Sequence, residues 1–385
     1  MTEKLFYQDP HQVEFDATVT SCTPTEDGTF LVSLDKTAFF PEEGGQNADS
    51  GFLNGIEVLD VQIKDNIIYH KMPVTFIPSN TVKGNVDWDK RFDYMQQHSG
   101  EHLISGLVNH HYGYNNVGFH LGDEEVTLDF DGVLTLEELR QIEVKANEAI
   151  SMDLPVLISF PSKEELNRLN YRSKIEIEGD VRIVEFPGFD ICACCAPHVD
   201  TTGQIGLIKI TNVQKHRGGI RVNILCGRRA LADYTTKQDS VSSISVQLSA
   251  KPDAVADAVA RLKEENLKQK NRMIALQQQL LQLQIAAIPV EQENVVLFFE
   301  DLDTPAMREA VNTLCETHNG FCSVFKGNDE DGYQYILGST HKNCKDAGAI
   351  LTEKFSARGG GSERMIQGSL KANKEEIMQC LYYDF

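Results

Sequence analysis

Two histidines stand four residues apart, at positions 98 and 102, in a stretch whose apolar residues recur at helical spacing. On a helix, His98 and His102 would lie one turn apart on the same face, so both rings could offer a nitrogen to one metal ion. The H-E-x-x-H motif of zinc peptidases needs a glutamate after the first histidine, but Ser99 stands there and Glu101 precedes the second. The spacing suggests a metal-binding helix, although two histidines also occur at this spacing by chance.

A thiol and an imidazole also stand four residues apart, at Cys194 and His198, in a segment bent by Pro197. Zinc accepts thiolate and imidazole ligands, usually four of them in a structural site. The spacing leaves open whether Cys192 or Cys195 replaces Cys194, and the alternative without a metal is a buried cysteine cluster beside an unrelated histidine. Together the two pairs predict one Zn²⁺ per chain, bound by His98, His102, Cys194 and His198.

A fold that mixes helices and strands must position these residues. Short β-branched runs between turn residues predict a β-rich stretch over the first ninety residues. Helices are expected over Trp88–His111 and Leu134–Met152, the second opened by a capping box of Thr135 and Glu138. We predict an α+β fold with a small N-terminal β module (1–90), a two-layer α/β domain that holds the metal (91–235), a long coiled-coil-like helix (236–290) and a small C-terminal α/β domain (291–385).

The long helix carries a heptad seam. Its members alternate in steps of four and three: Val255, Val259, Leu262, Asn266, Gln269, Met273, Leu276, Leu280 and Leu283. Polar seam residues such as Asn266 and Gln269 often fix register or partner number in a coiled coil. The favoured interpretation is a homodimer through this helix and the C-terminal domain; packing as a hairpin within one chain is the alternative.

The overall charge argues against non-specific binding of nucleic acid. The chain has 36 basic and 57 acidic residues, a formal net charge of −21, whereas such binding needs a basic surface. Between Thr201 and Ala232, however, there is no acidic residue and six basic ones. This basic strip predicts either a selective polyanion-binding surface or an ordinary solvated hairpin, and it consists of Lys209, Lys215, Arg217, Arg221, Arg228 and Arg229.

Composition also bears on the compartment. The N-terminal residues lack the basic-then-apolar order of a signal peptide, and no apolar run is long enough to span a membrane. In a cytoplasmic protein, which we expect here, a cluster such as Cys192, Cys194 and Cys195 is more often metal-binding or inert than disulfide-bonded.

Three separated motifs together resemble the editing domain shared by alanyl-tRNA synthetase and the free-standing alanyl-tRNA editing proteins called AlaX. Residues 37–46, TAFFPEEGGQ, are similar to the family's T-x-F-Y-P-E-x-G-G-Q. Residues 91–98, RFDYMQQH, are similar to R-x-x-x-M-x-x-H, and residues 194–206 to C-x-x-x-H-V-x-x-T-G-x-I-G. The helix and the glycine run Gly359–Gly361 that follow resemble the C-terminal domain of the synthetase, which makes this the long form of AlaX. The chain departs from the family at Phe40, where tyrosine is usual, at residues 195–197, and in the shortness of its glycine run.

The resemblance implies a hydrolase that acts in trans on tRNA(Ala) mischarged with serine, and in some members with glycine. It implies that Thr37 meets the serine hydroxyl, that Gln46 lines the same pocket, and that Gly44 and Gly45 let the backbone approach the substrate. The basic strip would then contact the tRNA acceptor end.

Two other functions remain open from the sequence: a tRNA-binding protein with a structural zinc and no turnover, and editing of another mischarged tRNA.

Overall fold

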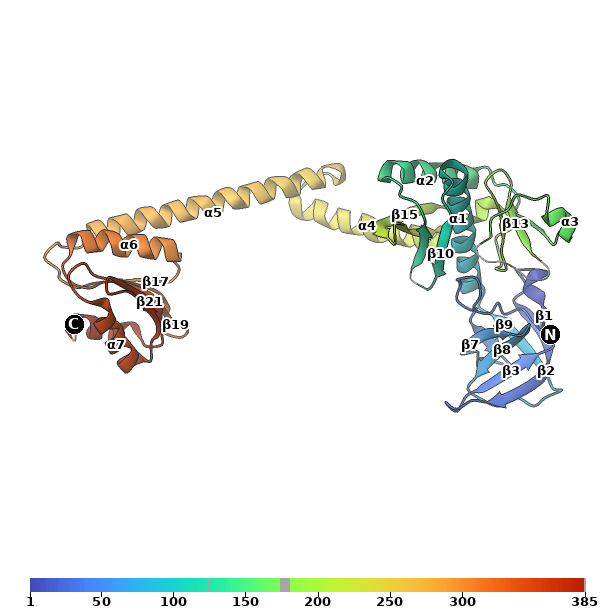
Figure 1. Ribbon diagram of the computed structural model, residues 1–385, viewed down its shortest axis with the longest axis horizontal. Coiled ribbons are helices and arrows are strands. Elements are labelled where there is room, and N and C mark those ends of the chain that lie inside the picture. The colour runs from blue at the N-terminus through green and yellow to red at the C-terminus, as the bar shows by residue number, and fades with distance from the viewer. Residues whose placement is uncertain (124, 174–180, 384–385) are drawn as a thin grey trace. The chain divides into compact units, whose positions relative to one another are not determined.

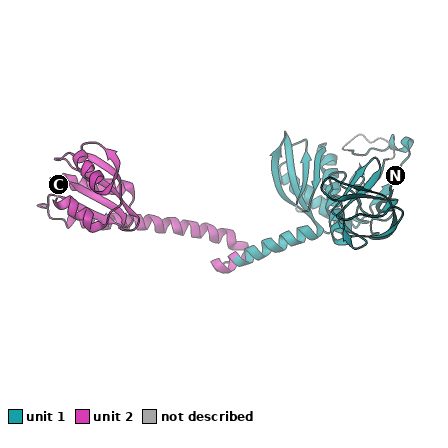
Figure 2. Cartoon of the chain, turned by 90° about the horizontal axis from the view of Figure 1, so that it is seen from below, with its two compact units in different colours: residues 1–243 teal, residues 244–385 magenta. Residues whose placement is uncertain are grey.

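The structure is a computed structural model that describes residues 1–123, 125–173 and 181–383. Within these ranges it contains several sheets and eight α-helices, so the coarse prediction of a mixed α and β fold is confirmed. The chain divides into two compact units, Met1–Ser243 and Ile244–Phe385 (Figures 1 and 2). Among the described helices, none has both the length and the apolar character that crossing a bilayer requires.

A seven-stranded antiparallel sheet opens the first unit. Its strand order is β6-β5-β9-β2-β3-β8-β7. Buried residues alternate with less buried ones along β8 and β9, so one face of the sheet packs on a core that includes Phe39 and Phe40. The strands are β2 (Glu14–Pro24), β3 (Phe30–Leu34), β5 (Gly51–Leu53), β6 (Ile56–Glu57), β7 (Asp60–Lys64), β8 (Ile67–Met72) and β9 (Thr81–Val86), with the short parallel pair β1 (Glu3–Lys4) and β4 (Lys36–Thr37) beside them.

Helix α1 (Trp88–Tyr112) follows this sheet and carries both histidines of the first motif. It begins at Asp87, whose side chain accepts hydrogen bonds from two N–H groups of the first turn, and ends at Gly113 in a left-handed conformation. The run from Gln96 to His102 is buried although most of it is polar. A buried polar run of this kind needs partners from the rest of the fold.

Those partners come from two sheets and a second helix around α1. A four-stranded sheet has the order β10-β11-β16-β15 and a three-stranded sheet the order β12-β13-β14. Helix α1 contacts α2, β14 and β16, and α2 has the capping box predicted for Thr135 and Glu138. The elements are β10 (Asn116–Leu121), β11 (Val126–Phe130), α2 (Leu136–Ser151), β12 (Leu157–Ser159), α3 (Lys163–Leu166), β13 (Ile183–Phe186), β14 (Asp190–Ala193), β15 (Ile208–His216) and β16 (Gly219–Cys226).

Two helices, separated by a short 3₁₀ turn, occupy the stretch 227–286. Helix α4 (Gly227–Leu248) ends before the 3₁₀ turn Pro252–Ala254, and α5 (Val255–Ala286) follows it. The apolar seam residues of α5 are largely exposed, for example Leu276 at 53% and Leu280 at 54%. The coiled coil stays a prediction.

A five-stranded sheet of order β17-β18-β19-β21-β20 organises the second unit. The glycine run lies in the edge strand β20, which was not expected from the sequence. The elements are β17 (Val295–Phe299), α6 (Thr304–Thr317), β18 (Cys322–Asn328), β19 (Gly332–Gly338), α7 (Cys344–Phe355), β20 (Arg358–Gly361), β21 (Met365–Leu370) and α8 (Lys374–Tyr383).

Candidate metal centre

The two sequence motifs converge on one point of the first unit. One ligand atom from each of His98, His102, Cys194 and His198 lies within 4.8 Å of every other, and Cys194 Sγ is 3.5 Å from His98 Nε2 and 3.3 Å from His198 Nε2. The histidines come from α1 and from the loop after β14, and all three are at most 2% exposed. Cys192 does not belong to this group of four; it forms a second group with His102 and Asp190.

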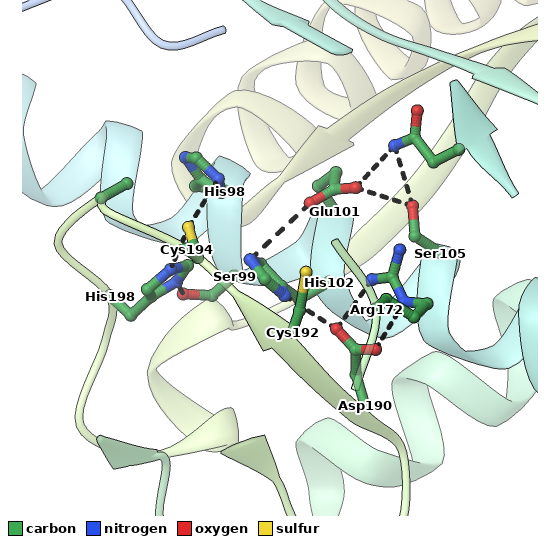
Figure 3. A network of polar contacts seen from close by, with 12 residues as sticks. His98, Ser99, Glu101, His102, Ser105, Arg172, Asp190, Cys192, Cys194 and His198 are labelled. Atoms are coloured by element: carbon green, nitrogen blue, oxygen red, sulfur yellow. Dashed lines mark hydrogen bonds and ion pairs between the residues drawn. The ribbon is translucent and has the colours of Figure 1, made fainter. Parts of the chain in front are cut away.

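The outer nitrogen of each imidazole is held by a different side chain, as Figure 3 shows for His102 with Asp190 and for His198 with Ser99. Nδ1 of His102 lies 2.8 Å from Asp190 Oδ2, and Nδ1 of His98 lies 2.8 Å from Gln46 Oε1. Nδ1 of His198 lies 3.0 Å from the hydroxyl oxygen of Ser99. A hydrogen bond at Nδ1 fixes the ring and leaves Nε2 as the atom that faces the cluster, which is how proteins prepare histidine for a metal.

Asp190 is itself held in place by Arg172. The guanidinium donates from Nε to Oδ1 at 2.7 Å and from its terminal nitrogen to Oδ2 at 2.8 Å. Burial alone would raise the pKa of Asp190, but the hydrogen bonds from His102 and Arg172 hold it below its usual range. Asp190 is therefore an ionised carboxylate behind His102.

The cluster favours a thiolate. Burial opposes ionisation of Cys194, but the charge of His98 and a hydrogen bond from His102 lower its pKa well below the ordinary value. Burial lowers the pKa of His198 to about 3, whereas Asp190 and Cys194 outweigh burial and raise that of His102 to about 9. A thiolate beside a neutral imidazole is the donor set that Zn²⁺ prefers, so these residues fit the metal.

Glu101 lies on the same helix, between the two histidines. It is 1% exposed, and its Oε1 accepts hydrogen bonds from Ser105 at 2.7 Å and from Asn116 at 2.6 Å. Its Oε2 is 3.9 Å from His102 Nε2, which makes it a further carboxylate at the edge of the cluster. The sequence had shown Glu101 only as a departure from the peptidase motif.

The residues that the family resemblance assigned to the substrate lie in the N-terminal part of this unit. Gln46 reaches the cluster through His98, and its buried Nε2 has no hydrogen-bond partner among the described residues. Gly44 and Gly45 have φ angles of 64° and 84°, and a Cβ on Gly45 would lie 2.5 Å from the carbonyl oxygen of Phe119. Glycine is therefore required at position 45, both by its φ and by this close approach.

Thr37 lies in β4 and is fully buried. Its hydroxyl oxygen is 2.9 Å from His70 Nε2 and accepts a hydrogen bond from the N–H of Phe39 at 3.1 Å. Burial lowers the pKa of His70 to about 4, so this histidine is neutral at pH 7. Its Nδ1 faces the carbonyl of Val32 at 3.2 Å, and Nε2 is therefore the acceptor for the Thr37 hydroxyl hydrogen.

The basic strip is largely paired with acidic side chains from other segments. Four of its six members form ion pairs: Lys209 with Glu143, Arg221 with Asp129, Arg228 with Asp89 and Arg229 with Asp93. In the part of the chain that the structure describes, only Lys215 and Arg217 of the strip lack an ion pair, and they flank the turn between β15 and β16.

Comparisons with known proteins are consistent across most of the chain. Residues 181–222, which include Cys194 and His198, match the family described as "Threonyl and Alanyl tRNA synthetase second additional domain". The "Alanine--tRNA ligase" of Methanopyrus kandleri is 30% identical over 390 residues, which cover 95% of this chain and 42% of the ligase. The "Alanyl-tRNA editing protein Aarsd1" of Rattus norvegicus is 27% identical over 403 residues, covering 99% of this chain and 97% of that protein.

The chain thus spans less than half the length of the ligase that it matches, but nearly all of the free-standing rat protein. These comparisons confirm the resemblance indicated by the motifs: the chain is a relative of long-form, free-standing alanyl-tRNA editing proteins and of the corresponding part of alanine–tRNA ligases.

Proposed function

We propose that this chain is an aminoacyl-tRNA hydrolase that removes serine, and also glycine, from mischarged tRNA(Ala) at a site containing one Zn²⁺. The main support is the buried cluster of three imidazoles and one thiol in a chain similar to editing proteins. Each imidazole is held at Nδ1 by a hydrogen bond to another side chain. His98, His102, Cys194 and His198 would hold the metal.

Four protein ligands favour a positioning role for the metal. When bound, Zn²⁺ would order the loop 194–198 against α1 and so organise the pocket beside it. The residues of the chain would bind and orient the aminoacyl ester for attack by water. Because such esters are already labile, orientation supplies much of the rate.

Selection against alanine requires a polar group that is satisfied only by serine. Thr37 donates its hydrogen to His70 and accepts one from Phe39, so its oxygen keeps one lone pair for the serine hydroxyl. When alanine occupies a site built to hydrogen-bond a hydroxyl, the polar group of the site is left without a partner. This costs free energy, so the site discriminates strongly against alanine. Gln46, whose Nε2 is a buried donor without a partner, would meet a substrate oxygen.

The decisive experiment compares deacylation of serine-, glycine- and alanine-charged tRNA(Ala), and of serine-charged tRNA(Thr), by the purified chain. We expect serine on tRNA(Ala) to be removed fastest and alanine to be spared. Hydrolysis no faster than the spontaneous rate would support the alternative, a tRNA-binding protein with a structural zinc. Faster removal from tRNA(Thr) would favour editing of another mischarged tRNA.

Neighbouring cysteines provide a matched pair of variants for the metal. Cys194→Ser should remove most bound zinc and abolish deacylation, because Sγ of Cys194 lies at the centre of the cluster. Cys195→Ser should retain both the zinc and the deacylation activity, because Cys195 does not belong to the cluster. Its sulfur lies beside Gly44, 3.1 Å from the position that a Cβ on that glycine would take. Zinc content measured by atomic absorption reports the ligand independently of activity, and equal zinc in both variants would refute the assignment of Cys194.

The role of Thr37 is tested by Thr37→Val with Thr37→Ser as the control. Valine should slow removal of serine about tenfold or more while leaving removal of glycine unchanged, because only serine offers a hydroxyl. Equal losses for both substrates would show that Thr37 acts through the fold, by way of His70.

We also propose that two copies associate through the seam of α5 and the C-terminal domain. The support is an apolar stripe with heptad spacing that is exposed in the described chain. The division into parts 1–90, 91–235, 236–290 and 291–385 is likewise proposed as the functional organisation.

A further inference from the structure

One buried arginine in the described chain has no acidic partner. Arg182 is 6% exposed and donates from one terminal nitrogen to the carbonyl oxygens of Cys194 at 2.8 Å and Ala196 at 2.9 Å. Among the described residues its buried Nε has no hydrogen-bond partner, and no carboxylate forms an ion pair with it. Two carbonyl groups do not neutralise a guanidinium.

The other well-buried arginines differ in this respect. Arg91, Arg172 and Arg229 each form an ion pair with an aspartate, respectively Asp49, Asp190 and Asp93. A buried charge without a counter-ion is costly. The position of Arg182 is therefore suited to an anion that no carboxylate of the described residues supplies.

Arg182 shares an aromatic ring with a second cation. Its Cζ lies 5.1 Å from the centroid of Tyr7, and Nζ of Lys4 also lies 5.1 Å from that centroid. Lys4 has no ion pair within the described ranges either. Phe160 is 55% exposed, and its ring centroid is 6.1 Å from that of Tyr7. Two unpaired cations beside an accessible aromatic pair combine a phosphate contact with a surface on which bases can stack.

We propose that Lys4, Tyr7, Phe160 and Arg182 form a binding site for the single-stranded 3′ end of an RNA, with a backbone phosphate at Arg182 and Lys4 and a base against Tyr7 or Phe160. Arg182 holds the carbonyls of Cys194 and Ala196, so a phosphate there lies beside the loop that carries two residues of the candidate metal centre. In an aminoacyl-tRNA only one ribose separates the last backbone phosphate from the ester. The choice of RNA as the ligand rests on the proposed function. The observation that Lys4 and Arg182 have no ion pair within the described residues does not depend on that function.

Binding of a short single-stranded RNA that ends in CCA with a free 3′-hydroxyl tests this site. The labelled RNA carries no ester, so binding is independent of hydrolysis, and fluorescence anisotropy at several salt concentrations gives the affinity. The variants are Arg182→Gln and Lys4→Gln. The control is Lys83→Gln, since Lys83 lies outside the proposed site and the basic strip and is already paired with Glu14 at 3.1 Å.

We expect Arg182→Gln to raise the Kd about tenfold and Lys4→Gln to raise it roughly threefold. Each should reduce the dependence of log Kd on log salt by roughly 0.7, as for one lost phosphate contact on a single strand. Lys83→Gln should bind like the unmodified chain. Zinc content and melting temperature show whether Arg182→Gln still folds; if it does not, Lys4→Gln, which changes a partly exposed side chain, carries the test.

Unchanged affinity in Lys4→Gln and in a folded Arg182→Gln would overturn the proposal. So would inorganic phosphate that binds as tightly as the RNA, because the site would then hold a free anion. A chain that binds this RNA through Lys4 and Arg182 but hydrolyses no mischarged tRNA would refute the proposed function and leave the site standing.

Discussion

Replacing Asp190 with alanine should weaken both the fold and the metal affinity, because this carboxylate links Arg172 to His102. The side chain of Asp190 is 1% exposed and accepts hydrogen bonds of 2.7 and 2.8 Å from Arg172 and of 2.8 Å from His102. Removing one partner of a buried ion pair costs about 3–5 kcal/mol. Since the side chain of Arg172 is 14% exposed and gains some water, we expect a loss near the lower end, about 3 kcal/mol.

The effect on the metal is separate from the effect on stability. Without Asp190 the ring of His102 loses the acceptor that fixes its orientation, and loss of such a contact typically weakens metal binding about 10- to 100-fold. This corresponds to about 1.4–2.7 kcal/mol. Competition with a chromophoric chelator measures the zinc affinity, and urea unfolding of the zinc-loaded and zinc-free chain measures stability. Asp190→Asn, which keeps an acceptor oxygen, should recover part of the zinc affinity.

A matched control is available in Asp129→Ala. Asp129 also binds an arginine through two hydrogen bonds, of 2.6 and 2.7 Å from Arg221, but it lies outside the cluster and both side chains are more exposed, at 15% and 32%. We expect a stability loss of about 1 kcal/mol or less and no change in zinc affinity. If Asp190→Ala binds zinc as tightly as the unmodified chain, the reasoning that Asp190 orients His102 is wrong.

Three further predictions concern the fold. The pKa of His70 is lowered from 6.5 to about 4 in the folded chain, so the unfolded chain takes up a proton first as the pH falls. The free energy of unfolding should be full above pH 6.5 and should fall by about 3 kcal/mol as the pH drops to 4. Urea titrations at several pH values should find this fall reduced in His70→Gln. Thr135→Ala removes the cap of α2 and should cost about 1 kcal/mol in thermal unfolding, whereas Thr135→Ser should be nearly neutral. Leu276→Glu places a charge in the seam of α5 and should shift light-scattering mass toward the single chain; an unchanged mass would exclude this seam as the interface.

Much of the local structure could be predicted because its determinants are close in sequence. Helix α1 was expected to run from Trp88 to His111, and it runs from Trp88 to Tyr112. The capping box of α2 joins residues only three positions apart. Periodicity and caps act within a few turns, so a single sequence carries them.

The surroundings of the candidate site could not be predicted, because they are contacts between distant segments. His102 and Asp190 are 88 residues apart, and Ser99 and His198 are 99 apart, with no periodic pattern that relates them. The pairing of Lys209 with Glu143 shows the converse: counting charges along one segment overlooks acids that arrive from another. Arg182 lies outside the basic strip, so counting charges along the sequence did not single out this residue either.

Arg91 ties the N-terminal sheet to α1 from inside the protein. It is fully buried in the first turn of α1, and it donates to the carboxylate of Asp49 and to the carbonyl oxygens of Pro10 and Ala38. A cut before residue 91 would leave a bare cation in one fragment and a bare anion in the other. The residues before and after this point are consequently one cooperative folding unit, and expression of either half alone should give an aggregating polypeptide.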